Sequence, residues 1–545
     1  LTAAITDLNL RGVSSAVNFI LTDDAYSINE TFPLEIKINN VSKPTITNTV
    51  TIKPNSGMFP FIQGAVASSA ILKILESFVR IDGSNSGGTD RSLTINNTST
   101  DHPYGVHIGS NGSIPITGVS IINCNITNGA NYSTPNYGVI ISDGEFPGIE
   151  GYFNNITIQN NRLQKSFYGI YCTAAVSPGN GNGLLITSNN LNSTGTNAIH
   201  ERGIYLEGID GAVVSNNVVG NLGGNDAGSP TGIWYGPGTI NSSMTNNLIG
   251  PMTESTGGGT PRGIAVSSGV TNSNITVSGN ELFNFSTSYG GAMTALYVYG
   301  TTTGVIIEKN KVSDIVNTNN FGFGARGIII NTNVSNSVIT IKNNFVWNVR
   351  ATAKSGPGAW GVGIGIDGST GGVNVYHNSV NMYGTLASDS AGINTAFGVL
   401  SPTVSAIDVR NNIFVNKFSN TLGSSDKSYA INSQAPSTAF TNINFNDYYV
   451  EGPVGILGFL GGDRTTLAAW QIATGQDGNS ISGNPDYISD TDLHINSNST
   501  FVSNKGFYLS DVLTDFDGDT RNNPPDIGGD EYSSASTTFA LSVNV

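Results

Sequence analysis

The chain has 545 residues, with 68 Gly, only 2 Cys, and 23 Lys and Arg against 38 Asp and Glu, a formal net charge of −15. This balance argues against nucleic acid as a partner, because nucleic-acid binding depends on Lys and Arg that neutralise phosphates. No apolar run reaches the length of about 18 residues that a membrane-spanning helix needs, so we expect no membrane span.

The first 80 residues predict an N-terminal cap followed by the first strands. Ile5 and Leu8 have helical spacing, and strands are expected over 17–21, 34–38 and 49–52. A solenoid needs such a cap, because its open end would expose strand edges and core. The chain begins at Leu1 without a charged and then apolar leader, so we expect that a signal or upstream segment has been removed.

A repeat of the form apolar-x-apolar-x-x-Asn-x-apolar dominates residues 81–450. Its apolar residues alternate, which is typical of a strand with one buried face, and no copy has the helical period of 3.6. Each unit of about 30 residues is too short for a four-stranded propeller blade, so each predicts one coil of a solenoid of roughly a dozen coils. The repeated Asn residues, 28 to 34 positions apart, are Asn161, Asn189, Asn217, Asn247, Asn280, Asn310, Asn344, Asn378 and Asn412.

Stacked coils would place these Asn residues in one buried column. An Asn at a tight bend tolerates the left-handed backbone region, and each amide can bond to the amide of the next coil. An unpaired buried amide would cost about 1–3 kcal/mol, so the column keeps the coils in register. The pattern resembles the right-handed parallel β-helix proteins, and the predicted fold is an all-β, right-handed parallel β-helix with short capping helices at or near its ends.

Cys124 stands in the Asn column, whereas Cys172 takes an inward position of a different strand. We therefore expect two buried free thiols rather than a disulfide.

A second repeat, Gly-apolar-x-apolar, runs between the Asn positions with the same period. We expect its x position to face solvent, where it supplies the aromatic side chains Tyr171, Tyr205, Trp234 and Tyr297. Rings on successive coils about 4.8 Å apart form a track on which a glycan could stack. Alternatively, the rings cover one another or lie beneath long loops.

The coil around residues 200–210 holds the densest set of ionisable groups, including His200, Glu207 and Asp210. Paired acids flanking a glycosidic bond would make a glycoside hydrolase, and a base with bound calcium would make a polysaccharide lyase. The motif series of pectin-hydrolysing β-helices is absent apart from Asp23-Asp24. An ordinary solvated surface is the other interpretation.

Residues 451–535 predict irregular coils and a C-terminal cap, with a helix over 465–475 that ends at Gly475. The segments 1–9, 79–84 and 467–477, and the DFDGDTR and PDIGGDE motifs of residues 515–531, resemble large secreted bacterial β-helix proteins with this type of C-terminal cap. The resemblance implies an extracellular or cell-surface location. Most members of that family have no assigned activity.

The acidic group Asp515, Asp517 and Asp519 offers oxygens to Ca²⁺, although its spacing fits an EF-hand loop poorly. The alternative is that Arg521 ties the cap together by charge-assisted hydrogen bonds, with no cofactor.

The tail, residues 536–545, has the alternation of a strand that lacks a partner in its own chain. It leads into a downstream domain, or it adds to a sheet edge of another copy and builds a filament. The residues on its apolar face are Phe539, Leu541, Val543 and Val545.

Together these features predict a secreted scaffold, adhesin or self-assembling fibre subunit whose partners are polysaccharide or copies of itself. A polysaccharide lyase or glycoside hydrolase is the alternative.

Overall fold

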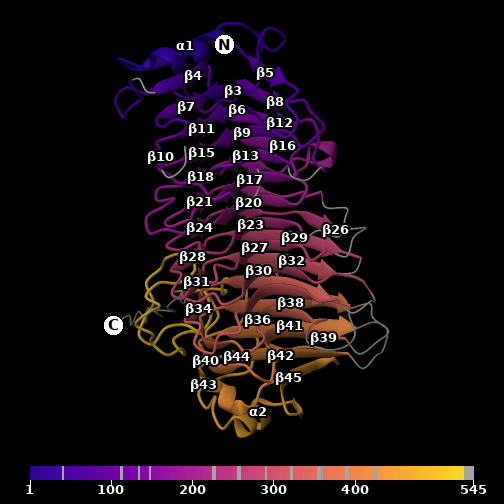
Figure 1. Ribbon diagram of the computed structural model, residues 1–545. Coiled ribbons are helices and arrows are strands. Elements are labelled where there is room, and N and C mark those ends of the chain that lie inside the picture. The colour runs from indigo at the N-terminus through magenta and orange to yellow at the C-terminus, as the bar shows by residue number, and fades with distance from the viewer. Residues whose placement is uncertain are drawn as a thin grey trace, which may run out of the picture. The chain divides into compact units, whose positions relative to one another are not determined.

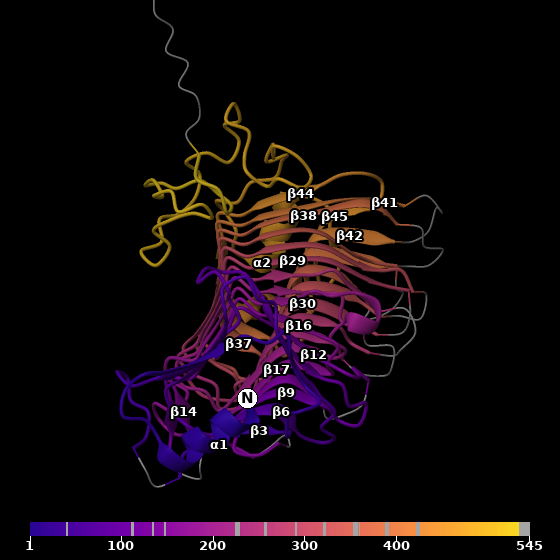
Figure 2. The ribbon, with the colours of Figure 1, turned by 90° about the horizontal axis from the view of Figure 1, so that it is seen from above.

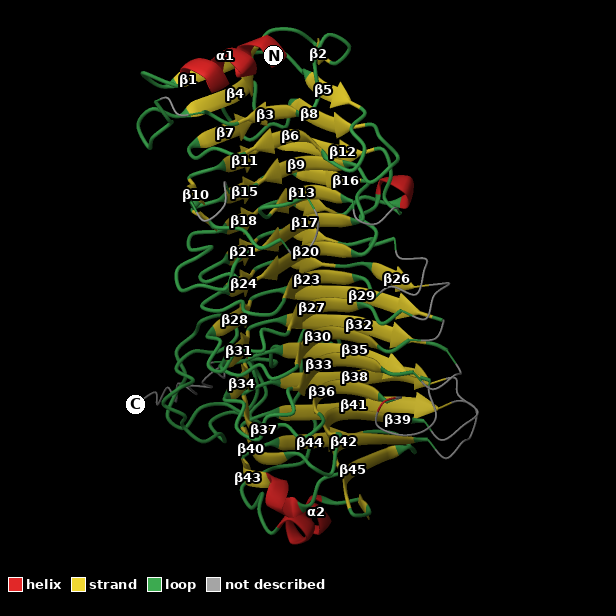
Figure 3. Cartoon of the chain, viewed as in Figure 1, coloured by secondary structure: helices red, strands yellow, loops and turns green. Residues whose placement is uncertain are grey.

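The computed structural model describes residues 1–39, 42–110, 114–132, 136–145, 149–223, 229–254, 259–288, 291–319, 323–352, 358, 360–386, 392–420 and 426–532. They form a parallel β-solenoid of about 12 turns with three large sheets, as Figures 1 and 3 show. The predicted all-β parallel β-helix is therefore confirmed. Within the described ranges, no helix has the length and apolar character needed to cross a membrane.

The chain divides into two compact units. The first contains Leu1–Ile306, Ile315–Asn319 and Ile329–Val334, and the second contains Ile307–Asp314, Asn320–Ile328 and Ser335–Val545. Three strands hold residues of both units: β31 (Val305–Glu308), β32 (Lys311–Asn317) and β33 (Ala325–Asn331).

In the first unit, each coil supplies one strand to each of three parallel sheets. Figure 2 labels β3, β6, β9 and β17 of the third sheet. The first sheet contains β1 (Val17–Leu21), β4 (Val50–Pro54), β7 (Val79–Asp82), β11 (Ser120–Ile122), β15 (Thr157–Gln159), β18 (Leu185–Thr187), β21 (Val213–Ser215), β24 (Ser243–Thr245) and β28 (Ile275–Ser278). The second contains β2 (Ala25–Tyr26), β5 (Phe61–Gly64), β8 (Leu93–Asn97), β12 (Cys124–Asn128), β16 (Arg162–Gln164), β19 (Asn190–Leu191), β22 (Val218–Val219), β25 (Leu248–Ile249) and β29 (Glu281–Thr287), with β26 (Met252–Glu254) also paired to β29. The third contains β3 (Leu34–Ile36), β6 (Ala70–Ile74), β9 (Tyr104–Ile108), β13 (Tyr137–Ile141), β17 (Tyr168–Thr173), β20 (Arg202–Glu207), β23 (Thr231–Tyr235), β27 (Arg262–Val266) and β30 (Met293–Tyr299). A separate pair joins β10 (Ile116–Thr117) to β14 (Phe153–Asn154), and a short 3-10 turn, η1, spans Gly195–Asn197.

The core of this unit is built by equivalent residues that stack from coil to coil. In the first sheet the parallel register places buried side chains directly over one another, in the order Ile52, Ile81, Ile121, Ile158, Ile186, Val214 and Met244. The Gly repeat is required by the same close stacking. A Cβ on Gly105 would lie 2.5 Å from the carbonyl oxygen of Gly138 and 2.6 Å from Cγ2 of Ile126.

The N-terminal helix α1 (Thr2–Arg11) buries Ile5 and Leu8, as the sequence predicts. Its first turn is held by Glu30, which accepts hydrogen bonds from the Leu1 amino group at 2.8 Å and from the Thr2 backbone N–H at 2.5 Å.

The predicted Asn column is present in both units. In the first unit the Nδ2 of Asn161 donates to the Oδ1 of Asn189 at 3.1 Å, and the same oxygen accepts the backbone N–H of Asn161 at 2.9 Å. Equivalent bonds join Asn189 to Asn217, Asn217 to Asn247 and Asn247 to Asn280, and in the second unit Asn310 to Asn344, Asn344 to Asn378, Asn378 to Asn412 and Asn412 to Asn446. As predicted, Cys124 occupies the column, where its N–H donates to Asn161 at 2.9 Å. Both cysteines are buried free thiols, also as predicted.

One detail of the column differs from the sequence prediction. The left-handed residue is not the column Asn but the residue just before it, with φ of 51° at Asn160, 55° at Asn216 and 52° at His377. The amide of the column Asn points along the stack toward the next coil. The residue before it adopts the left-handed conformation and makes the bend.

The second unit repeats the three-sheet arrangement. Its first sheet contains β34 (Ile339–Lys342), β37 (Gly371–Tyr376), β40 (Ser405–Arg410) and β43 (Phe440–Asn444), and its second contains β35 (Phe345–Ala351), β38 (Ser379–Leu386), β41 (Ile413–Asn420) and β44 (Asp447–Val450). Its third contains β36 (Gly361–Ile366), β39 (Ile393–Val399), β42 (Lys427–Ser433), β45 (Gly455–Leu460) and the antiparallel β46 (Asp463–Arg464). A 3-10 turn, η3, spans Ser437–Ala439.

The predicted C-terminal helix is α2 (Leu467–Thr474), which follows β46. Thr466 caps its start by accepting the N–H of Ala469 at 3.2 Å, and Gly475 ends it in the left-handed conformation. Trp470 is fully buried, with its ring centroid 6.3 Å from that of Tyr448, so the helix closes the last coil of this unit.

Residues 480–532 do not form coils. They pack along the side of the second unit, where Arg521 donates to Asn343 Oδ1 at 2.8 Å and Phe516 stacks on Phe345 at 4.2 Å. Figure 1 shows this yellow segment beside β34. Arg521 also pairs with Glu531 at 3.3 Å, so it ties this segment together as the sequence suggests.

Candidate functional site

The predicted aromatic track is a packed cluster on the third sheet of the first unit. Tyr171 and Tyr205 are each only 6% exposed and stack at 4.8 Å, so the prediction that they face solvent is wrong. Rings on successive coils are close enough to cover one another, and Tyr104 and Tyr137 add to the cluster. Trp234 and Tyr297 keep intermediate exposure.

A guanidinium group also packs against the rings of the aromatic cluster. The guanidinium of Arg202 lies 5.1, 5.1 and 4.6 Å from the ring centroids of Tyr168, Tyr205 and Trp234. Tyr205 donates its hydroxyl to Glu207 at 2.8 Å, and burial raises the pKa of this phenol. These contacts stabilise the sheet surface, and the rings of Tyr171 and Tyr205 have little exposed area.

The first unit also has an open groove, which we call the Tyr132 groove. It has a cavity volume of about 600 Å³ and lies in the loops that follow β12, β19 and β22, with Thr253 of β26 at its edge. The Tyr132 side chain is 70% exposed, and the lining also contains the buried side chains of Ala198 and Leu222.

The polar groups of the Tyr132 groove are hydroxyls, amides and one imidazole. They belong to Thr194, Thr196, Thr253, Asn131, Asn221 and His200. None of the described residues that line it carries a carboxylate, an ammonium or a guanidinium group. Asn131 and Asn221 are held in place, since Asn131 donates to the Ala198 carbonyl at 3.1 Å and Asn221 donates to Asn192 at 2.5 Å.

The sequence prediction included His200 but missed the rest of the groove. Tyr132 belongs to neither repeat, and the only signal for it was its position in a loop between two strands, where binding residues concentrate. His200 is largely buried and packs on the ring of Phe167 at 4.9 Å.

The structure does not bring His200, Glu207 and Asp210 together. His200 precedes β20 and Glu207 ends it, so about seven extended residues, roughly 20 Å, separate them. Asp210 accepts hydrogen bonds from Gly179 N–H at 2.8 Å and from Asn241 Nδ2 at 2.7 Å. His200 therefore does not join Glu207 in one catalytic set.

A second, charged pocket of about 470 Å³ in the first unit includes Lys73, His107, Asp143 and Glu145. Burial raises the pKa of Glu145, but hydrogen bonds from Ala70 and Ser69 and the ion pair with Lys73 outweigh it and hold the pKa below its ordinary value. Burial lowers the pKa of His107, whose Nε2 lies 2.8 Å from the Ser142 carbonyl. The acid is thus kept ionised and paired.

The acidic group of the C-terminal segment is not a cluster of three carboxylates. Asp515 accepts backbone N–H groups from Gly518, Asp519 and Glu531 at 2.8, 2.8 and 2.9 Å. Asp519 is exposed, and Asp517 pairs with His494 at 2.8 Å. The tail residues Phe539, Leu541, Val543 and Val545 lie outside the described residues.

Comparison with known proteins shows likeness of fold alone. No family model matches the chain, and no curated protein matches it. The Dettilon tailspike protein is 10% identical, with a TM-score of 0.33 over 90% of this chain and 65% of that chain. The A-module of the Azotobacter vinelandii mannuronan C-5 epimerase AlgE6 is 11% identical, with a TM-score of 0.35 over 89% of this chain and 93% of that one. A mannuronic acid specific polysaccharide family 6 lyase from human gut microbiota is 11% identical, with a TM-score of 0.30 over 83% and 85%.

Proposed function

We propose that this chain is an extracellular or cell-surface β-helix protein, a scaffold or adhesin, that binds neutral glycans in the Tyr132 groove. The observation that carries the proposal is an exposed aromatic ring beside hydroxyl and amide groups, in a groove whose described lining has no ionised carboxylate or cation.

This chemistry matches an uncharged sugar. The apolar face of a pyranose ring packs on an aromatic ring, while its hydroxyl groups need donors and acceptors such as Thr hydroxyls and Asn amides. An acidic polysaccharide is a poorer fit, because the chain carries a formal charge of −15 and the groove offers no cation among its described residues.

A glycan array followed by titration calorimetry tests the proposal. Tyr132→Ala should weaken binding of a neutral oligosaccharide by about 10-fold or more, since an aromatic contact contributes about 0.5–1.5 kcal/mol beyond its buried area. Phe59→Ala is the matched control, because Phe59 is 71% exposed in the same unit and does not line the groove. Equal binding by both variants would remove the groove as the site.

Self-association is the second part of the proposed scaffold role, and it rests on the alternating sequence of residues 536–545. Deletion of this tail should abolish any filaments seen by electron microscopy. Filaments that persist without the tail would assign assembly to another surface.

A polysaccharide lyase or glycoside hydrolase is the less supported alternative. A glycosidase needs one carboxyl group that stays protonated as the general acid, whereas Glu145 in the charged pocket is held ionised by the Ala70 N–H, the Ser69 hydroxyl and Lys73. A reducing-sugar assay on the glycans that bind would separate the two functions, because a binding protein releases no product.

A further inference from the structure

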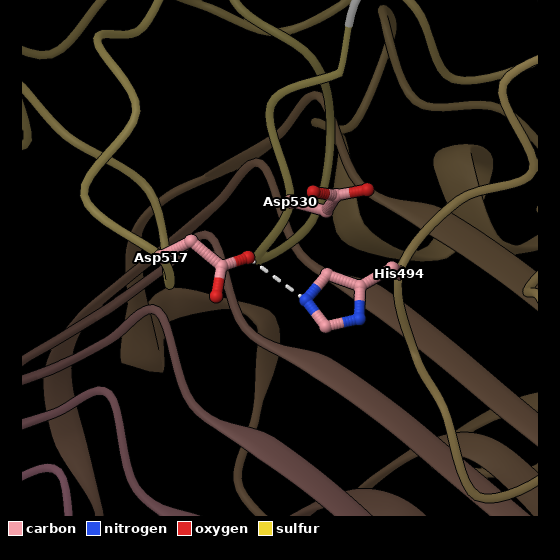
Figure 4. A group of neighbouring side chains, drawn as sticks. All are labelled: His494, Asp517 and Asp530. Atoms are coloured by element: carbon pink, nitrogen blue, oxygen red, sulfur yellow. Dashed lines mark hydrogen bonds and ion pairs between the residues drawn. The ribbon is translucent and has the colours of Figure 1, made fainter.

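Three side chains that could bind a metal ion converge in the C-terminal segment of the second unit. One nitrogen of His494 and one oxygen each of Asp517 and Asp530 all lie within 4.8 Å of one another. Figure 4 shows the three side chains together. His494 Nε2 is 2.8 Å from Asp517 Oδ2. The three residues come from separate stretches of a segment that has almost no regular secondary structure.

The imidazole of His494 is held in a fixed orientation. Its Nδ1 pairs with Asp492, and its ring packs edge-on against Phe345, with centroids 5.0 Å apart and planes at 87°. Phe345 is itself stacked on Phe516. The Nε2 atom is thereby directed toward the two carboxylates. A carboxylate on the far nitrogen is the arrangement that orients histidine ligands in metal sites.

Asp530 provides an independent indication of a ligand. This side chain is only 7% exposed, and it receives one hydrogen bond, from the N–H of Ile495 to Oδ2 at 2.7 Å. Its other oxygen has no hydrogen-bond partner among the described residues. The Asp530 carboxylate therefore keeps one oxygen that can coordinate a cation. A cation at this position would be coordinated by that oxygen.

We propose that His494, Asp517 and Asp530 bind one divalent transition-metal ion of the zinc class, with Asp492 orienting the histidine. The imidazole donor decides the class, because Zn²⁺ accepts nitrogen together with carboxylate oxygen, whereas Ca²⁺ takes six to eight oxygens. The ion would link three stretches of chain whose β-pairing in this region of the described chain is limited to the isolated bridges Tyr487 to Ile495 and Thr514 to Thr520, so its role is to stabilise this segment against the coils of the second unit. Binding requires a neutral His494 with an unprotonated Nε2.

Isothermal titration of the chelator-treated full chain with Zn²⁺ at neutral pH tests this site, with Ca²⁺ and Mg²⁺ as comparison ions. We expect one Zn²⁺ per chain, a higher melting temperature with Zn²⁺, and much weaker binding of the other two ions. Asp530→Asn and Asp517→Asn should each reduce Zn²⁺ affinity by 10-fold or more, and Asp492→Asn by about 10- to 100-fold.

Asp519→Asn is the matched control, because this exposed Asp lies in the same loop as Asp517 without joining the cluster. It should bind Zn²⁺ like the unaltered chain. Circular dichroism shows whether each variant is folded, and the exposed position of Asp517 makes Asp517→Asn the variant that tests the site if Asp530→Asn does not fold. Absence of Zn²⁺ binding by the folded chain would overturn the proposal and leave His494 as an imidazolium between Asp492 and Asp517. Preferential binding of Ca²⁺, or unchanged Zn²⁺ affinity in folded Asp517→Asn, would overturn it equally.

Discussion

Replacing Asn378 by Ala tests whether the Asn column stabilises the coils. Asn378 is fully buried, and its Oδ1 accepts the backbone N–H and the Nδ2 of Asn344 at 3.0 and 2.9 Å. Its Nδ2 donates to the carbonyls of Ile341 and Tyr376 at 2.9 and 3.1 Å and to Oδ1 of Asn412 at 3.0 Å. Alanine removes all of these bonds at once.

The expected loss is large for a single side chain. The N–H of Asn344 would be left buried without its acceptor, which costs about 1–3 kcal/mol. The other lost bonds contribute a net value of about 1 kcal/mol each. Because some of the freed groups keep a second partner, we expect a total loss of about 3–5 kcal/mol in the free energy of unfolding.

Urea denaturation followed by tryptophan fluorescence measures this loss, since Trp347, Trp360 and Trp470 report on the second unit. Asn374→Ala is the matched control, because Asn374 precedes Asn378 on the same coil and makes one long hydrogen bond, 3.4 Å to Thr340. The control should change stability by less than about 0.5 kcal/mol. Similar midpoints for the two variants would refute the idea that amide bonds along the column maintain the stack.

Three further outcomes follow from buried polar groups. The pKa of Glu145 is held below its ordinary value. Its contribution to the free energy of unfolding is therefore fully present when the pH is above that ordinary value, and it is lost as the pH falls through the folded-state pKa. Glu145→Gln should lower the free energy of unfolding at neutral pH by about 1 kcal/mol, and it should make the melting temperature fall less steeply as the solution is acidified. Burial raises the pKa of the thiols of Cys124 and Cys172, so neither should react with an aromatic disulfide reagent until the chain unfolds, and reaction of the folded chain would contradict their burial. Asp477→Ala should destabilise the last coil by about 2–4 kcal/mol, because the buried indole N–H of Trp470 loses the acceptor that lies 2.7 Å away. Asp477→Asn should cost less, because it keeps an acceptor oxygen. Denaturation followed by tryptophan fluorescence measures both variants.

The repeat predicted the fold well because it encodes contacts between equivalent positions. Alternating residues such as Ile158 identify the strands, and Asn161 identifies the buried column. The contacts between coils then follow from the alignment of the repeats. The candidate site was predicted less well, because exposure of a strand residue depends on its neighbours. Tyr205 occupies the expected strand position, but it is buried by Tyr171 and Arg202, which only the stacked coils bring close.

The position just before the column Asn also has an exposure that the sequence repeat does not predict. In the first unit this left-handed residue is exposed at Ser188, Asn216 and Asn246. In the second unit the equivalent Asn343 and His377 are buried, although their backbone conformation is the same.

The difference in burial comes from the segment 480–532, which packs against these left-handed bends in the second unit. The carbonyl of Thr514 accepts the Nδ2 of Asn343 at 2.8 Å, and the Gly528 carbonyl lies 3.2 Å from the Nδ1 of His377. Burial lowers the pKa of His377, so its ring is neutral and its Nδ1–H can donate to that carbonyl while Nε2 accepts from Asn411 at 2.8 Å. In the first unit this bend only turns the chain. In the second unit the residue at the same position also forms hydrogen bonds with the non-repetitive segment 480–532. That segment also carries His494, Asp517 and Asp530, so the proposed metal ion and these bends would stabilise the same stretch of chain, through chemistry that no single repeat unit contains.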